Sequence, residues 1–242
     1  MNTEFTNKIK SFLDIGQTVS KETLLEYIYG EFPKLKKSSI NVYLSQLKKE
    51  GVIKNPSRGF YSIKGKEGYQ PNVDIKLKRL FNRVKKEFPF AELCVWNTKW
   101  LNEFMRHQPF KYYTVLEVEK EVAESVFHAL NGEGKPVFLE PDAETFQLYI
   151  SNSSEALIVK QLVSESPLKK ANKVKTPTLE KLLVDMTIDT ELYAAQQGEL
   201  RFIYENAFDK YEVNKNKMKR YAYRRNREQE VEKLTDLTLA KK

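Results

Sequence analysis

The amino-acid sequence predicts a protein of the α+β or α/β class, with a small helical amino-terminal domain and a larger α/β domain that holds a mixed sheet and ends in a helical tail. Apolar residues recur at helical spacing over the first fifty residues, and two short strand-like runs follow them. From residue 92 onward, strand-like and helix-like stretches alternate, as in a sheet covered by helices. A segment with Gly68, Pro71 and few apolar residues separates the two patterns. We therefore predict domains at residues 1–66 and 75–242, joined by a linker at 67–74.

Three helices and a hairpin follow one another in the first domain. The first two helices are predicted at residues 3–13 and 21–31, and Ser20 is a suitable N-cap because its hydroxyl can accept a bond from a free amide of the first turn. Ser38 or Ser39 is predicted to cap the third helix, which is expected to run to about Glu50, before a glycine that can adopt the left-handed conformation. Two strand-like runs around a Pro- and Gly-containing turn then predict a hairpin. This order is typical of a winged helix-turn-helix.

The third helix is expected to lie in the major groove of double-stranded DNA, where base edges present distinguishable patterns. Its outward side carries short polar residues and lysines, with no acidic residue before Glu50, which suits contact with a polyanion. Basic residues on or beside the hairpin are expected to neutralise phosphates. The predicted DNA contacts are Lys37, Ser38, Ser39, Asn41, Val42, Ser45, Gln46, Lys48, Lys49, Lys54, Arg58 and Lys64. The alternative is a winged helix that contacts only proteins.

The distribution of charge agrees with a polyanionic partner. The 242 residues carry 41 Lys/Arg and 33 Asp/Glu, a formal net charge of +8. Basic residues outnumber acidic ones by 12 to 7 over residues 1–70 and by 11 to 5 over residues 210–242, whereas the stretch between is mildly acidic. The run Lys215–Arg227 has seven basic residues and no acidic one. Its outward side, with Lys217, Arg220, Arg224 and Arg225, is a second DNA-contacting surface, a surface for an acidic partner, or a solvated face.

In the second domain, strands and helices are predicted to alternate. Strands are expected at 92–96, 112–118, 137–139, 146–150 and 156–160. Helices are expected at 74–88, 99–105 and 119–130, from Thr176 through Asp185, and throughout the chain after Gly198.

No residue pattern indicates catalysis, a metal or a cofactor, so we expect a protein that is not an enzyme. Pro141–Asp142 lacks the later Asp/Glu-x-Lys of restriction-type nucleases, and the chain has no Gly-Ser dipeptide of the kind that nucleotidyltransferases place before their carboxylates. Glycine-rich phosphate loops are also missing. We interpret the acidic residues at 142, 144, 189 and 191 as loop or cap residues, and we find His107 and His128 isolated from further metal ligands.

The remaining composition excludes further classes. Cys94 is the only cysteine, which rules out an intrachain disulfide and a Cys-rich zinc site, and we expect it to be a core residue. Residues 1–13 do not resemble a signal peptide, and no apolar run approaches the roughly 18 residues of a membrane span. We expect a cytoplasmic protein without a membrane partner.

Two groups of residues resemble the AbiEi family, the antitoxins of type IV toxin–antitoxin systems that act in abortive infection and phage defence. In the first domain the matching residues are Ser39–Ile40, Tyr43–Leu44–Ser45, Leu47, Gly51–Val52–Ile53 and Arg58–Gly59–Phe60–Tyr61. In the second they are Trp96–Asn97–Thr98, Val159 and the Thr-Pro-x-x-Glu-Lys-Leu-Leu-Val-Asp segment at 176–185. The resemblance implies a transcriptional regulator that represses its own operon and whose second domain counteracts a nucleotidyltransferase-like toxin.

Two other functions remain open on the sequence. One is a solitary winged-helix regulator whose α/β domain senses a ligand or a protein partner. The other is a nuclease or nucleotidyltransferase that the winged helix targets to DNA. A neighbouring nucleotidyltransferase-type reading frame favours the antitoxin, and magnesium-dependent cleavage or nucleotide transfer favours the enzyme.

Overall fold

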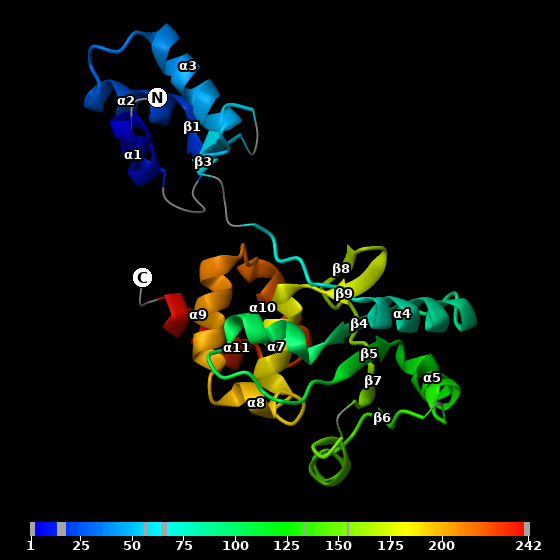
Figure 1. Ribbon diagram of the computed structural model, residues 1–242. Helices are drawn as coiled ribbons and strands as arrows, with labels where there is room; N and C mark the ends of the chain where they lie inside the picture. Colours follow the sequence, from blue (N-terminus) through cyan, green and yellow to red (C-terminus); the bar gives the residue numbers. More distant parts are fainter. Residues whose placement is uncertain are drawn as a thin grey trace. The chain divides into compact units, whose positions relative to one another are not determined.

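The chain folds into two compact units, Met1–Glu67 and Gly68–Lys242. The computed structural model describes residues 3–13, 18–55, 58–63, 67–132, 134–153 and 155–239 (Figure 1). Both units combine helices with small sheets, so the predicted mixed α/β class is confirmed.

Over its described residues, the first unit has three helices and three short strands. They are α1 (Thr3–Phe12), β1 (Val19–Ser20), α2 (Lys21–Glu31), α3 (Lys37–Lys49), β2 (Ile53–Lys54) and β3 (Phe60–Ile63). The central strand β3 is antiparallel to both β1 and β2. Apolar side chains from all three helices and from β2 form one core: Phe5, Ile9, Leu13, Leu24, Ile28, Ile40, Leu44, Leu47 and Ile53.

Local chemistry sets the ends of these helices. The hydroxyl of Ser20 accepts a hydrogen bond from the amide of Thr23 at 3.1 Å, which confirms the predicted cap of α2. Gly51 follows α3 with φ of +70°, the left-handed conformation expected at that position. The predicted cap of α3 is wrong, however. The helix begins at Lys37, two or three residues earlier than predicted, with Lys36 as a cap residue that makes no side-chain bond, so Ser38 lies inside the first turn.

The second unit contains a four-stranded sheet, a hairpin and helices. The strands of the sheet are β4 (Leu93–Asn97), β5 (Thr114–Val118), β6 (Val137–Leu139) and β7 (Leu157–Gln161). Their order is β4-β5-β7-β6, in which β5, β7 and β6 run parallel and β4 is antiparallel to β5. The strands β8 (Leu168–Ala171) and β9 (Val174–Pro177) pair with each other as an antiparallel hairpin.

Helices cover both faces of this sheet (Figure 1). On one face lie α4 (Ile75–Glu87) and α5 (Ala123–Leu130), packed on Leu116 and Val118 of β5. On the other face the alternate residue Val115 belongs to a larger core with the carboxy-terminal helices. The helical elements of that side are the 3₁₀ segment η1 (Thr98–Phe104), α7 (Leu179–Ile188), α8 (Ala194–Gln197), α9 (Leu200–Lys210), α10 (Lys215–Arg224) and α11 (Glu228–Leu239).

Several predictions for the second unit need correction. Residues 146–150 are not a strand but a π-helical turn, η3 (Phe146–Ile150), which continues the short helix α6 (Ala143–Thr145). The apolar residues of this segment were interpreted as a strand pattern, but their burial follows helical spacing. Phe146 and Ile150 are buried, whereas Leu148 and Tyr149 are exposed. Ile75, the first residue of α4, is 68% exposed although it is apolar. The β8–β9 hairpin was not predicted at all.

Residues 68–74, predicted as part of a linker, are tied to the second unit. Tyr69 is buried in the larger core, and its ring lies 5.2 Å from that of Tyr211. The Trp100 indole donates a hydrogen bond to the carbonyl of Asn72 at 2.9 Å. The functional division of the chain into domains stays a prediction.

Among the described residues, no helix has both the length and the apolar composition that crossing a membrane requires.

Candidate nucleic-acid interface

One side of α3 faces solvent and carries the residues that the sequence analysis assigned to DNA contact. Ile40, Leu44 and Leu47 are buried, whereas Ser39 is half-buried. The other predicted residues of the helix are exposed: Lys37, Ser38, Asn41, Val42, Ser45, Gln46, Lys48 and Lys49. We call these exposed residues, with Ser39, the α3 surface.

The α3 surface is polar and positive but not uniformly charged. Lysines lie at its two ends, at 37 and at 48–49, and the positions between them are neutral. Val42 is 56% exposed in the middle, so an apolar side chain stands among hydroxyl and amide groups. Such a mixture can offer hydrogen bonds to base edges, an apolar contact to a thymine methyl group, and cations to the flanking phosphates.

The β2–β3 hairpin adds further basic groups to the first unit. Lys54 and Arg58 are exposed. The side-chain amide of Asn55 donates a hydrogen bond to the backbone carbonyl of Phe60 at 2.9 Å and so connects the two ends of the turn. Lys64, also predicted to contact DNA, lies outside the described residues.

The four basic residues predicted on the outward side of α10 have different surroundings in the structure. One side of this helix is apolar, and its residues Met218, Tyr221 and Ala222 are buried. The prediction is wrong for Arg225, which turns inward and donates to Asp185 at 2.9 Å. The other three basic residues have different surroundings. Arg224 pairs with Glu165, the Lys217 ammonium lies 4.0 Å from a Glu180 carboxylate oxygen, and Arg220 is exposed.

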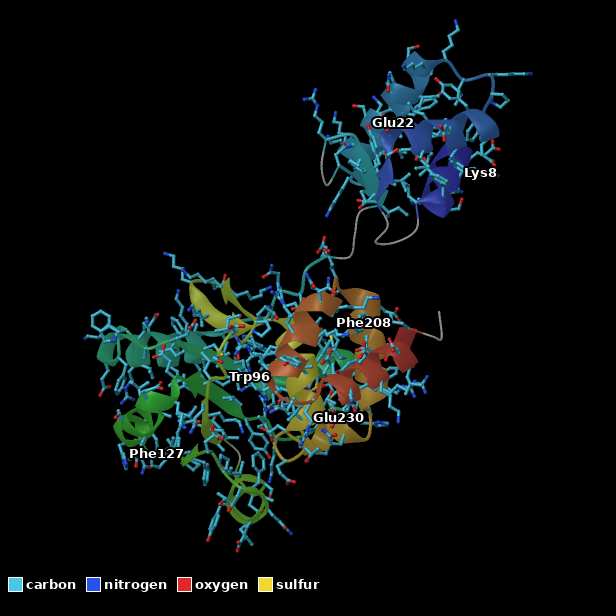
Figure 2. The ribbon with its side chains drawn as sticks, turned by 180° about the vertical axis from the view of Figure 1, so that it is seen from behind. Lys8, Glu22, Trp96, Phe127, Phe208 and Glu230 are labelled. Atoms are coloured by element: carbon cyan, nitrogen blue, oxygen red, sulfur yellow. The ribbon has the colours of Figure 1, made fainter. Side chains whose placement is uncertain are left out.

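A buried ion cluster, which the sequence analysis missed, lies beneath α10. Lys181 of α7 is 1% exposed, and its ammonium lies 2.6 Å from carboxylate oxygens of both Glu117 and Asp185. Trp96 donates to Glu117 at 2.9 Å, and its place in the interior is seen in Figure 2. The cluster is completed by hydrogen bonds to Asp185 from Tyr221 and Arg225, both at 2.9 Å.

Charge balance explains how this cluster is tolerated. Burial by itself lowers the pKa of Lys181, but the negative charges of Asp185 and Glu117 outweigh it and raise that pKa well above its usual value. The ammonium is therefore charged and neutralised by carboxylates from β5 and from its own helix. Lys181, Glu117 and Asp185 are nearly inaccessible to solvent, and their contacts connect the sheet, α7 and α10.

Two of the acidic residues interpreted as loop or cap residues have structural partners. Asp142 caps α6, and its carboxylate accepts from the Thr145 amide at 2.8 Å. Asp189 accepts from the Leu192 amide at 3.2 Å and pairs with Lys160 at 2.8 Å. Both match the interpretation as cap or loop residues.

The thiol of Cys94 and the imidazole of His107 lie in different surroundings. Cys94 is fully buried in β4, where burial raises the pKa of its thiol well above the usual value. His107 contacts the carboxylate of Glu199 on the surface. Within the described ranges, no three His, Cys, Asp or Glu side chains gather as metal ligands would.

Comparison with known proteins gives a family but no activity. None of the curated proteins that were compared with the chain matches it. The model of DUF6577, a family of unknown function, matches residues 39–241. These residues span most of α3, the β2–β3 hairpin and the entire sheet of the second unit. The chain therefore belongs to DUF6577, a family of unknown function.

Proposed function

We propose that the chain is a transcriptional regulator whose first unit is a winged helix-turn-helix that binds double-stranded DNA through α3. The topology supports this proposal: β1 lies between α1 and α2 in sequence, and β3 is flanked by β1 and β2, as in a winged helix. The observation that carries the proposal is the solvent-exposed α3 surface, which has no acidic residue and has lysines at both ends.

The contacts divide into two kinds. Asn41, Ser45 and Gln46 are the candidates for reading bases, because amide and hydroxyl groups pair with base edges in the major groove. Lys48, Lys49 and the exposed basic residues of the hairpin are candidates for phosphate contact, which positions the protein without reading sequence. Binding should weaken with rising salt as counterions are released.

Selection of binding sites from random duplex DNA by the purified full chain tests the proposal. We expect one enriched sequence. Asn41→Ala should relax the preference at one position by about 1–3 kcal/mol. Lys48→Ala should weaken binding to all duplexes evenly and reduce the slope of log affinity against log salt by about 1.

Lys10→Ala is the matched control, since Lys10 is an exposed lysine on α1 and its loss changes the net charge equally. It should leave affinity and salt slope nearly unchanged. Absence of an enriched sequence, or equal effects of Lys10→Ala and Lys48→Ala, would refute the assignment of α3.

The resemblance to AbiEi antitoxins extends the proposal to autorepression and to neutralisation of a nucleotidyltransferase-like toxin. The residues of α7 that carry this resemblance include Lys181 and Asp185, which are buried. They support the fold of the second unit, so a toxin would contact other residues. Co-expression with a nucleotidyltransferase-type protein from the same operon tests the extension: rescue of growth supports it, and toxicity unaffected by the chain removes the antitoxin role while leaving DNA binding intact.

A further inference from the structure

A cavity of about 490 Å³ lies in the second unit between α4, the carboxy-terminal end of α5 and the sheet. It opens at the edge where β5, β6 and β7 begin, since it is lined by the first residues of all three strands: Thr114, Val137 and Leu157. This region of α4, α5 and the strands can be followed in Figure 1. Its volume falls within the roughly 300–1,000 Å³ that small-molecule sites usually occupy.

The inner wall of the cavity is apolar. Leu77 and Leu130 are buried beneath it. Leu80, Val137 and Leu157 are only half-buried, so each leaves aliphatic surface available to an occupant. Covering such surface favours binding by about 25 cal/mol for each square ångström removed from water, so the wall suits an apolar or aromatic body.

The rim of the cavity is positively charged. Its described lining includes the cations Lys76, Arg83, Lys99 and Lys135 and the carboxylates Asp74 and Glu155. Glu155 is held by Lys76 at 3.0 Å and by Lys135 at 2.5 Å. The carboxylate of Asp74 caps α4 by accepting from the Leu77 amide at 2.8 Å.

Lys99 is therefore the cation best placed for a ligand. Its side chain is exposed, and among the described residues no carboxylate pairs with it. The ammonium lies 5.9 Å from the centroid of the Tyr112 ring, which also lines the cavity. The Tyr112 hydroxyl in turn accepts from the Asn102 amide at 2.7 Å, so this aromatic wall is fixed in position.

We propose that the cavity binds a small organic anion, with its apolar or aromatic body against Leu80, Val137 and Leu157 and its anionic group at Lys99. The combination of an aliphatic wall with Lys99, which pairs with no described carboxylate and lies beside an aromatic ring, selects against both neutral hydrophiles and cations. The site gives the second unit a ligand-binding role that is independent of DNA recognition.

The experiment uses 8-anilino-1-naphthalenesulfonate, an aromatic body with one sulfonate, titrated into the full chain by fluorescence and calorimetry. We expect saturable binding at one site. Lys99→Glu should weaken it at least about tenfold, because a charged hydrogen bond is lost and repulsion replaces it. Leu80→Trp, which fills the cavity without changing charge, should weaken it comparably.

A second cavity of the same unit provides the matched control. It has a volume of about 450 Å³ and is lined by Phe110, Lys111 and Phe146 among others, so it also joins apolar surface to a lysine. Lys111→Glu carries the same charge change as Lys99→Glu and should leave the affinity unchanged. The proposal is overturned if no saturable binding occurs, if Lys99→Glu and Leu80→Trp bind the probe as the unaltered chain does, or if Lys111→Glu is the variant that loses it.

Discussion

Replacing Lys181 by methionine should destabilise the second unit severely. The substitution keeps much of the side-chain volume but removes the ammonium that lies 2.6 Å from both Glu117 and Asp185. Asp185 keeps its hydrogen bonds from Tyr221 and Arg225, each at 2.9 Å. Glu117 keeps one neutral donor, the Trp96 indole, in a site that is 5% exposed. The loss therefore falls mainly on Glu117.

The magnitude follows from this imbalance. Leaving a buried charge without its partner costs about 3–5 kcal/mol, whereas whole domains are stable by only about 5–15 kcal/mol. Glu117→Gln in the Lys181→Met background removes the uncompensated charge. The double variant should therefore lose less than the two single variants together, by about 0.5–3 kcal/mol.

Urea denaturation followed by tryptophan fluorescence measures this loss selectively. Both tryptophans of the chain, Trp96 and Trp100, belong to the second unit, so the signal does not report the first. Lys175→Met is the control, because its ion pair with Glu92 at 2.5 Å is at the surface and such pairs contribute at most about 1 kcal/mol. If Lys181→Met costs no more than Lys175→Met, the structural role of the buried ion cluster is wrong.

Two smaller predictions concern a carboxylate and a glycine. The ammonium groups of Lys135 and Lys76 lower the pKa of Glu155 from an ordinary 4.5 to about 2. The ion pairs of Glu155 therefore contribute to stability above pH 4.5 and are lost as the pH falls toward 2. Carbon-13 NMR titration should show this low midpoint, Lys135→Met should move the midpoint upward, and a midpoint near 4.5 in the unaltered chain would contradict the prediction. Gly51→Ala places a side chain at φ of +70°, which costs about 1–2 kcal/mol. Hydrogen exchange of α3 peptides should therefore accelerate by about 5–30-fold. Exchange that stays unchanged relative to α4 peptides, which are the internal reference, would mean that the glycine is not required.

Local signals in the sequence predicted most of the first unit. The bounds of α2 match the prediction because Ser20 provides a cap and the apolar residues of the helix recur with a clear period. The strand β1 was missed because two residues carry no periodicity, and it exists only through pairing with β3. The exposure of the α3 surface was predictable because a single helix pattern determines which residues are buried.

The second unit depends more on contacts between distant residues. The hairpin of β8 and β9 turns at Asn172 and Lys173, which both have positive φ. A lysine at the second turn position lacks the glycine signal by which such turns are usually recognised. The buried ion cluster joins Glu117 and Lys181, which are 64 residues apart, so no spacing in the sequence indicated it. The inward turn of Arg225 follows from the same cluster.

The cysteine content of the chain permits a direct test of DNA contact by α3. Cys94 is fully buried, and the raised pKa of its thiol further reduces its reactivity. A second thiol introduced at an exposed position should therefore react with N-ethylmaleimide in preference to Cys94. Ser45→Cys places that thiol on the α3 surface, and Ser11→Cys places one on the exposed side of α1 as a control. Saturation with a selected duplex should slow alkylation at position 45 and leave position 11 unchanged. Equal alkylation rates at position 45 with and without bound DNA would contradict binding through α3.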